Sequence, residues 1–371
     1  MLLRSLVCDP FLRTFVAATM VVLWGSSSAG AAANDTLRLG IISDLVMHLP
    51  LFVAEDGNLF AEEKVTVKRE TKYGKFRTSA SLLNNEIDLI LQSTEGYFEL
   101  ADIYGSKEYK IIGGIAATSG SAVVSRLPMP NTGFSWNHLR QKRFLGRDRN
   151  STPMYFLRSV LVTNGVDPTN VKFNTTAPVP ARVRIWNRKK SHDYGIFYEP
   201  DVSTIIRTGN GYFAAMLGPS VGKIDSTVFI VKTAFLKSAK NRDLVQRFAN
   251  AMQRALNITA QSSLASLLPI TKRHVVDRVR GKIRFHHDSD LEESIKRYRS
   301  IDFWKTDLRV APRALTEMQR LIIESGGTRT KRHRCYDDVV DMRFAEAALA
   351  KYPTGKPVGK LPGSRKSADC G

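Results

Sequence analysis

Residues 37–42 (LRLGII), 65–69 (VTVKR), 87–91 (IDLIL) and 110–115 (KIIGGI) are four short runs rich in Leu, Ile and Val. Each run has the length and composition of a β-strand. Helical patterns separate the runs, and the first of these helices begins at Pro50. Strands that alternate with helices at this spacing predict a parallel, wound sheet.

The same alternation starts again in the middle of the chain. Residues 143–146 (RFLG), 171–173 (VKF) and 194–198 (YGIFY) are predicted strands of a second wound unit, which ends near Gly222. Residues 227–231 (TVFIV) form a late strand without a partner nearby in the sequence. The predicted fold class is therefore α/β, with two wound units.

The last third of the chain is predicted to be mostly helical. Two helices show apolar stripes by their spacing: Phe76, Ala80 and Leu83 early in the chain, and Leu244, Phe248, Met252 and Ala255 late in it. Further helices are expected over residues 272–280, 291–298, 314–324 and 336–350.

The N-terminus has the three parts of a secretory signal. Arg4 and Arg13 precede an apolar run over residues 15–24, and small residues follow over 26–33. The apolar run is short for a membrane span, so we expect cleavage and export to the periplasm. An uncleaved membrane anchor is the alternative. Cys8 lies before the apolar run, not at its end, so it does not indicate a lipoprotein.

The chain of 371 residues carries a net charge of +20. A positive field attracts anionic ligands, anionic membrane surfaces or nucleic acid. An exported protein rarely meets nucleic acid, and no zinc-finger or RNA-binding pattern is present, so no nucleic-acid partner is expected. A solvated basic surface without a role is the alternative.

Cysteine and histidine spacing matches no zinc site, so neither a metal nor another cofactor is expected. Cys335 and Cys370 would remain after cleavage, and the compartment would permit a disulfide between them. Residues 351–371 are rich in Pro, Gly and Lys and are expected to be a disordered basic tail.

Four stretches, in this order, carry a likeness to a known family. They are residues 39–60 (from LGI to PLFVAEDGNLF), 80–89 (ASLLNNEIDL), 151–168 (from STPMYFL to NGVDP) and 198–200 (YEP). The chain resembles substrate-binding proteins of ABC transporters, of the nitrate/sulfonate/taurine and thiamine-pyrimidine-precursor class, over about residues 37–348.

The resemblance implies the type II periplasmic-binding fold, in which two wound α/β lobes are joined by two crossing strands. Residues 34–120 and 225–350 would form the first lobe together with the C-terminal helices, and residues 121–224 the second. Residues 121–125 and 227–231 would be the crossing strands. The segment 1–33 would be the signal peptide.

Ligands of open α/β sheets bind beyond the carboxyl ends of the strands. On this rule and on the resemblance, the expected ligand-binding residues are polar or aromatic and follow the strands: Ser43, Asp44, Met47, His48, Gln92, Ser93, Thr94, Thr118, Ser119, Asn150, Ser151, Thr152, Tyr155, Tyr198 and Glu199. Many of them are also normal helix-capping residues, Thr152 before Pro153 among them.

Glu199 is the most informative of these residues. A carboxylate facing the cleft would accept hydrogen bonds from an amine and repel an oxyanion. Alternatively, Glu199 lies in the first turn of a helix, where acidic residues are favoured anyway. Lys75 or Arg77 would bring positive charge to the cleft or lie on the surface.

The resemblance implies an extracytoplasmic solute-binding component of an ABC importer, a monomer with a permease and its ATPase as partners and no catalytic residue. The ligand would be a small heteroaromatic amine, slightly favoured by Glu199, Tyr198 and Tyr155, or a small organic or inorganic anion. An enzyme of the same fold acting on a pyrimidine or related precursor is an alternative. A ligand-sensing adaptor for a membrane receptor is another.

Overall fold

The computed structural model describes residues 35–72, 74–175, 182–279, 282–326 and 333–355. The chain divides into two units, residues 1–33 and 34–371, and everything described below belongs to the second unit. The predicted signal peptide over residues 1–33, and the predicted tail beyond residue 355, lie outside the described residues.

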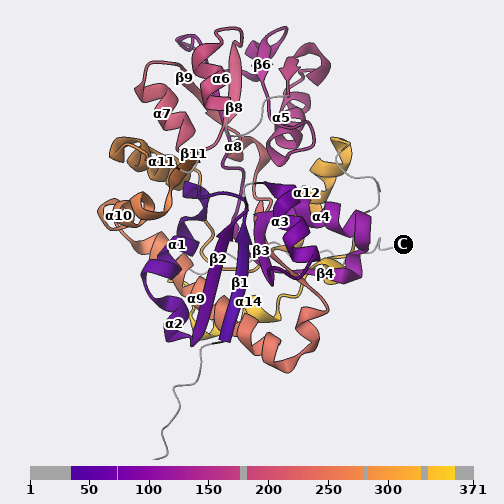
Figure 1. Ribbon diagram of the computed structural model, residues 1–371. Coiled ribbons are helices and arrows are strands. Elements are labelled where there is room, and N and C mark those ends of the chain that lie inside the picture. The colour runs from indigo at the N-terminus through magenta and orange to yellow at the C-terminus, as the bar shows by residue number, and fades with distance from the viewer. Residues whose placement is uncertain (1–34, 73, 176–181, 280–281, 327–332, 356–371) are drawn as a thin grey trace, which may run out of the picture. The chain divides into compact units, whose positions relative to one another are not determined.

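The first sheet has five strands, in the order β2-β1-β3-β10-β4 (Figure 1). The late strand β10 runs antiparallel to both of its neighbours, β3 and β4, and thereby finds partners more than 100 residues earlier in the chain. The remaining neighbours are parallel, as the alternation of strands and helices predicts. The strand bounds are β1 Asp35–Ile41, β2 Val65–Thr71, β3 Leu89–Ser93, β4 Tyr109–Ala116 and β10 Thr227–Lys232.

The second sheet has the order β7-β6-β8-β5-β9. Strand β5 is antiparallel to both β8 and β9, whereas β6, β7 and β8 are parallel. Its strands are β5 Ala122–Ser125, β6 Arg143–Leu145, β7 Lys172–Asn174, β8 Tyr194–Phe197 and β9 Tyr212–Met216. The predicted fold class, two wound α/β units, is thus confirmed, and the elements around each sheet are called the first and second lobe below.

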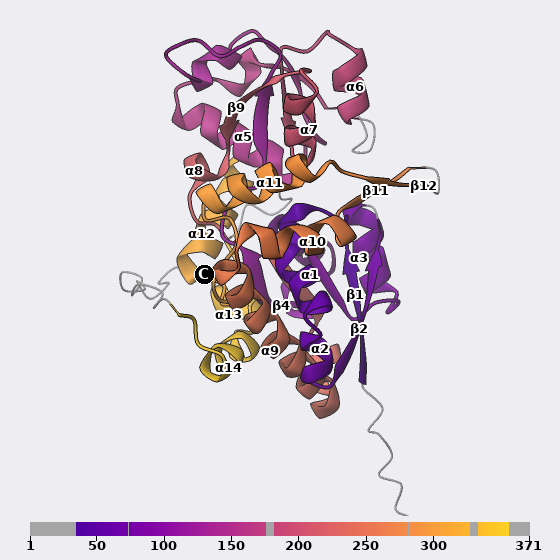
Figure 2. The same ribbon diagram turned by 90° about the vertical axis from the view of Figure 1, so that its left-hand side faces the viewer.

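Helices lie on both faces of each sheet (Figures 1 and 2). Their bounds are α1 Leu49–Asp56, α2 Leu59–Glu62, α3 Lys75–Leu83, α4 Thr94–Tyr104, α5 Thr152–Thr163, α6 Arg182–Arg188, α7 Asp201–Arg207, α8 Gly218–Val221, α9 Ala239–Gln261, α10 Leu264–His274, α11 Asp288–Ser300, α12 Pro312–Glu324, α13 Tyr336–Val339 and α14 Arg343–Lys351. Within the described ranges, no helix is both long and apolar enough to cross a membrane.

The apolar stripe predicted on the late helix is confirmed in α9. All four of its residues are buried, and the ring of Phe248 packs 5.0 Å from Phe229 of β10 and 5.5 Å from Phe60 of α2. Full burial of one such side chain stabilises the fold by about 2–3 kcal/mol. The central helix α9 therefore holds the early and late parts of the first lobe together.

The apolar face predicted for α3 is wrong. Phe76 is 76% exposed, and the buried residues of this helix are Thr78, Ser81 and Leu82. The helix lies against Gly40 of β1, where a Cβ would come 3.2 Å from the Thr78 methyl group. Close contact with the strand selects the smaller face of the helix, which hydrophobic spacing does not reveal.

The helix predicted over residues 272–280 is also wrong. Helix α10 ends at His274, and the chain continues as a hairpin of β11 Val276–Val279 and β12 Lys282–Phe285. Adjacent β-branched residues, Val275 and Val276, favour the extended chain at this point.

The helix predicted over residues 336–350 exists as two pieces, α13 and α14, separated by Val340 to Met342. Val340 interrupts it because it bridges to Ile111 of β4. Cys335, just before α13, is disulfide-bonded. The partner considered from the sequence, Cys370, lies outside the described residues.

Candidate functional site

The carboxyl ends of the parallel strands in the two lobes are joined by direct contacts. The carboxylate of Glu95 in α4 accepts a hydrogen bond from the Thr152 backbone N–H of α5, 3.2 Å away, and another from the Thr152 hydroxyl. Both residues are buried, at 2% and 5% exposed. An acid at the start of a helix is favoured by the free N–H groups there. Glu95 of the first lobe therefore binds the helix start of the second.

Lys75 of α3 lies at the same junction. Its Nζ is 2.6 Å from the Glu99 carboxylate, 3.9 Å from Glu95 and 3.5 Å from the carbonyl oxygen of Asn150 in the second lobe. Burial alone would lower the pKa of Lys75, but the two glutamates outweigh it and raise the pKa. The charge of Lys75 is thus already balanced by acids of its own lobe.

The side chain of Gln92, at the end of β3, is 1% exposed, and neither its amide nitrogen nor its amide oxygen has a hydrogen-bond partner among the described groups. Gly96 packs against it, because a Cβ there would come 2.5 Å from Gln92 Nε2. Buried amides in native proteins are almost always satisfied. Gln92 therefore keeps one donor group and one acceptor without partners among the described groups.

Two arginines of the second lobe lie beside Tyr198, which follows β8. The guanidinium carbon of Arg147 is 4.8 Å from the centre of the Tyr198 ring, and its Nε is buried without a partner among the described groups. The guanidinium of Arg182 donates to the carbonyl oxygens of Gly146 and Ile196. In the part of the chain that the structure describes, neither guanidinium forms an ion pair with a carboxylate.

Charged groups of both lobes affect the pKa of the Tyr198 hydroxyl. Burial raises the pKa of its hydroxyl, the Arg147 charge opposes this rise, and Glu95 of the first lobe adds to it. Burial also lowers the pKa of Arg182 well below its usual range. Gln92, Glu95, Arg147, Arg182 and Tyr198 are together called the strand-end cluster below.

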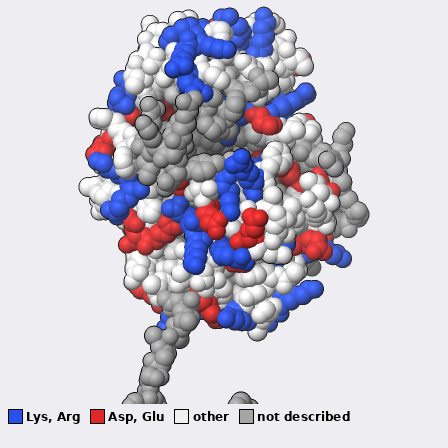
Figure 3. Space-filling model, viewed as in Figure 1, with Lys and Arg blue, Asp and Glu red and all other residues white. Residues whose placement is uncertain are grey.

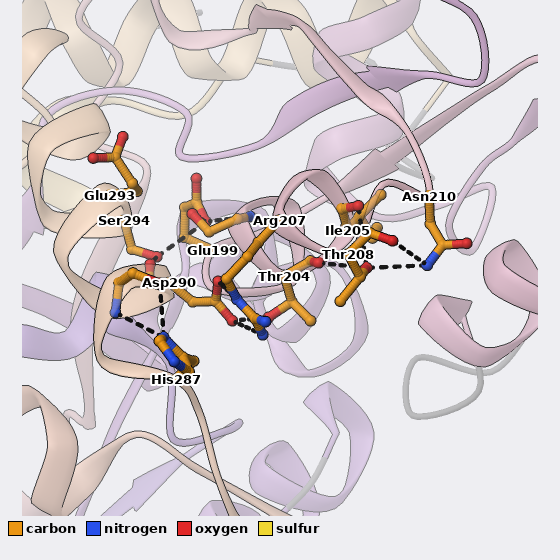
Figure 4. A network of polar contacts seen from close by, with 12 residues as sticks. Glu199, Thr204, Ile205, Arg207, Thr208, Asn210, His287, Asp290, Glu293 and Ser294 are labelled. Atoms are coloured by element: carbon orange, nitrogen blue, oxygen red, sulfur yellow. Dashed lines mark hydrogen bonds and ion pairs between the residues drawn. The ribbon is translucent and has the colours of Figure 1, made fainter.

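Glu199 is completely buried and bound by protein groups (Figure 4). Its carboxylate accepts hydrogen bonds from the Ser203 hydroxyl at 2.8 Å, the Ser203 backbone N–H at 3.1 Å and the Ser294 hydroxyl at 3.0 Å. It also pairs with the Arg297 guanidinium at 2.6 Å. Because Ser294 and Arg297 lie on α11, the acid joins that helix to the second lobe.

A second buried acid, Asp290, also joins α11 to the second lobe. Asp290 of α11 is 2% exposed and accepts from Arg207 Nε at 2.7 Å, Arg207 Nη2 at 2.9 Å and the Thr204 hydroxyl at 2.8 Å (Figure 4). Helix α11 also packs against α10 and the turn at Val46–His48 in the first lobe. Helix α11 therefore contacts both lobes.

The loop after β1 is held within the first lobe. Asp44 pairs with Arg69 at 2.5 Å and accepts from the Thr71 hydroxyl at 2.9 Å. His48 Nδ1 is 2.9 Å from the carbonyl oxygen of Ser43, and burial lowers the pKa of its imidazole to about 4. The carbonyl oxygen of Met47 accepts from the Trp304 indole at 3.1 Å.

Several other predicted residues make structural contacts with the segment just before β10. The Thr94 hydroxyl donates to the carbonyl of Asp225, and the Thr118 hydroxyl lies 2.6 Å from the carbonyl of Gly222. The remaining predicted residues, Ser93, Ser119, Ser151 and Tyr155, lie at the start of α4, in the buried turn after β4, at the N-cap of α5 and within α5. For all of them, binding of a ligand stays a prediction.

The expected capping role of Thr152 is wrong. Ser151 is the N-cap residue of α5, and the Thr152 hydroxyl donates to Glu95 instead. The expected ligand-binding residues leave out Glu95, Arg147 and Arg182, which the structure brings to this junction. The first two lie in the stretches 92–95 and 147–152 that the strand-end rule indicates. Arg182 carries no such signal, because it reaches the site from α6.

Within the described ranges, no group of three or more His, Cys, Asp or Glu side chains is placed to hold a metal ion.

Comparison with known proteins gives one curated relative and many structural neighbours. No model of a known protein family matches the chain. A protein of Bacillus subtilis (strain 168) described as "putative binding protein YtlA" is 24% identical over 334 residues, which cover 87% of this chain and 93% of the relative.

Three solved structures represent the neighbours. The alkanesulfonate-binding protein SsuA from Xanthomonas axonopodis pv. citri, bound to MOPS, has a TM-score of 0.62 and 14% identity, covering 81% of this chain and 96% of its own. The ligand-binding component of an ABC-type import system from Staphylococcus aureus scores 0.66 at 14% identity, covering 85% and 99%. The nitrate-binding protein NrtA from Synechocystis PCC 6803 scores 0.60 at 12% identity, covering 86% and 89%.

These likenesses establish the periplasmic-binding-protein fold for this chain. The family resemblance seen in the sequence is confirmed to this extent: the structural neighbours are binding proteins of ABC-type systems, and the curated relative is described as a binding protein.

Proposed function

We propose that the chain is the extracytoplasmic ligand-binding component of an ABC importer. The observation that supports this most directly is the strand-end cluster, in which unsatisfied polar groups are buried where the carboxyl ends of two wound sheets meet. The neighbours with the same fold are described as binding proteins for sulfonates and nitrate or as an ABC import component. A permease and its ATPase are the partners that follow from this role, and the periplasm is the compartment.

We further propose that the ligand is a small anion. Arg147 and Arg182 bring two guanidinium groups without carboxylate partners among the described residues, and Gln92 adds an amide donor. Guanidinium groups suit sulfonate, carboxylate and nitrate because their N–H groups match pairs of oxygen acceptors. Tyr198 would lie against an apolar part of the ligand.

The alternative ligand, a heteroaromatic amine, has less support. It relied on Glu199 as a free acceptor, but that carboxylate is already bound to Ser203, Ser294 and Arg297. An amine would have to break the Arg297 ion pair, and breaking a buried pair by losing one partner costs about 3–5 kcal/mol.

The proposed mechanism is conformational and requires no bond chemistry. A ligand that contacts both lobes stabilises the closed arrangement, which the Glu95–Thr152 contact also favours. The permease would then recognise the closed form, so that ligand increases the docked population.

Isothermal titration calorimetry with an anion panel tests the proposal. The protein is unfolded and refolded to remove carried-over ligand, then titrated with alkanesulfonates, taurine, nitrate, aromatic carboxylates and aminopyrimidines. We expect an anion to bind, and Arg147→Gln to weaken its affinity about 10- to 100-fold, because one charge-assisted contact is lost.

Arg140→Gln is the matched control, because Arg140 is exposed and contacts the carbonyl of Gly165 at the far end of the second sheet. The affinity of the Arg140→Gln variant for the anion should equal that of the unchanged protein. If only aminopyrimidines bind, and Glu199→Gln abolishes this binding, the anion proposal is contradicted. The protein would then be the binding component of an importer for an amine.

A further inference from the structure

Seven exposed cationic side chains gather at the amino ends of the strands in the second sheet. Strand pairing places Arg143 of β6 opposite Lys172 of β7, and the carbonyl of Lys142 accepts from the Lys172 backbone N–H at 2.9 Å. The end of α6 and the turn before β8 add the others. This cluster, called the basic tip, consists of Arg140, Lys142, Arg143, Lys172, Arg188, Lys189 and Lys190.

The basic tip does not belong to the ligand site. Strands β6, β7 and β8 run parallel, so their amino ends lie together and their carboxyl ends lie together at the opposite edge. The strand-end cluster follows the carboxyl ends, at Arg147 and Tyr198, whereas the basic tip precedes the amino ends. The basic tip therefore lies at the opposite edge of the sheet from the strand-end cluster.

The charge of the basic tip is scarcely balanced by acids. In the described part of the chain its one ion pair joins Arg143 to Asp193 at 3.6 Å. The other acid in this region, Asp167, accepts from the Thr169 backbone N–H at 2.8 Å. Arg140 donates to the carbonyl of Gly165 at 2.6 Å, and Lys190 to the Asn210 side chain at 3.3 Å.

Several arginines of the first lobe, in contrast, form ion pairs with acids. Arg38 pairs with Asp88 at 2.5 Å, Arg254 with Glu62 at 2.5 Å and Arg247 with Asp35 at 2.9 Å. Figure 3 shows the same contrast: blue side chains gather over the upper end of the second lobe with few red ones, whereas both colours are mixed below. Cations without acidic partners are thus concentrated at the tip, whereas on the first lobe they are interspersed with ion pairs.

Two exposed apolar side chains lie beside the basic tip. Leu127 is 70% exposed and follows Arg126, whose backbone N–H donates to the carbonyl of Asp193 at 2.8 Å. Tyr212 is 46% exposed and pairs with Ser125 at the start of β9. A basic surface with an exposed aliphatic residue and an aromatic residue is typical of proteins that rest on a lipid surface.

We propose that the basic tip binds the anionic phospholipid headgroups of a membrane. Cations that come from separate segments and are scarcely paired with acids suit mobile headgroups, which need charge but no fixed geometry. Leu127 would enter the boundary between headgroups and acyl chains, and Tyr212 would lie at headgroup level. An acidic protein partner would instead require a buried apolar centre, and Leu127 and Tyr212 are too few to form one.

Sedimentation with lipid vesicles tests this proposal. The purified protein is mixed with vesicles of neutral phosphatidylcholine or of phosphatidylcholine with 30% phosphatidylglycerol, at low and at physiological salt. We expect binding to the anionic vesicles that weakens with salt. Each cation near such a surface contributes about 1 kcal/mol, so the loss of three cations in the triple variant Lys172→Glu, Lys189→Glu, Lys190→Glu should weaken binding at least about 100-fold. The three added carboxylates should weaken it further.

The matched control reverses three exposed lysines of the first lobe, Lys68, Lys107 and Lys237, to glutamate, which changes the net charge by the same amount. It should retain binding. Leu127→Ser should bind several-fold more weakly with the same salt dependence. Equal binding to neutral vesicles, no binding to anionic ones, or equal losses in the two triple variants would overturn the proposal. Unchanged vesicle binding in the tip variant would also overturn the proposal, and it would indicate that the apolar N-terminal segment binds the vesicles.

Discussion

His48 shows how burial decides the charge of a single residue. Its side chain is 3% exposed, and its imidazole has a pKa of about 4 in the folded protein against an ordinary value of 6.5. Burial is the main cause, because it disfavours the charged form. The hydrogen bond to the Ser43 carbonyl identifies Nδ1 as the protonated nitrogen of the neutral ring.

The folded protein should therefore lose stability as the pH falls from 6.5 towards 4. Over this range the unfolded chain takes up a proton at His48 and the folded chain does not, so unfolding is favoured by up to about 3 kcal/mol. Urea unfolding at pH 7 and at pH 4.5 measures this loss.

The control is His48→Asn, which keeps a donor near the Nδ1 position and cannot gain charge. Its pH dependence should be flatter than that of the unchanged protein by the same amount. Equal slopes in the two proteins would contradict the assignment.

Among the elements, α11 is joined to the second lobe by specific buried ion pairs. Asp290 binds Thr204 and Arg207 of α7, and Glu199 binds Ser294 and Arg297 of α11. These acids are buried and paired, so removal of either one leaves an uncompensated cation. Exposed pairs on the same helix, such as Glu293 with Lys296 at 2.8 Å, contribute little.

Asp290→Ala should therefore lower the free energy of unfolding by about 2–4 kcal/mol, whereas Glu293→Ala should change it by less than about 0.5 kcal/mol. Urea unfolding measures both, and hydrogen exchange should show faster exchange of the α11 amides only in Asp290→Ala. Similar values for the two variants would mean that apolar packing, not the ion pairs, holds α11 against the second lobe.

At the scale of the whole molecule, the relative position of the lobes depends on a few polar contacts. Glu95 is the acid of the first lobe that binds the start of α5 in the second. Glu99, one turn further along α4, pairs with Lys75 of its own lobe instead. The two residues form a matched pair for separating closure from local stability.

Glu95→Ala should open the lobes in the absence of ligand, which small-angle X-ray scattering would detect as a larger radius of gyration. Because less of the protein is then closed, ligand affinity should fall about tenfold. Glu99→Ala should leave both quantities unchanged. A radius of gyration that stays the same in both variants would show that other contacts between the lobes, such as those of α11 with α7 and of α12 with α5, set the lobe positions.

The two wound sheets and most of their helices are predictable from the amino-acid sequence. Alternation of strand and helix patterns is a local property, so residues 37–42 or the stripe on α9 indicate their structure without reference to the rest of the chain. The strand-end rule likewise indicated where buried polar groups gather, and Gln92 is among them.

The partners of those polar groups become visible only when the chain is folded. The sequence allows Glu199 to be a free acceptor, but in the fold it is bound by Arg297, which lies 98 residues later. The sequence likewise favours Thr152 as a helix cap, but its hydroxyl donates to Glu95. Strand β10 also had no visible partner before the sheet was assembled. In each case the deciding contact joins residues far apart in the chain, and such contacts leave no periodic pattern in a single sequence, because they depend on where packed elements meet.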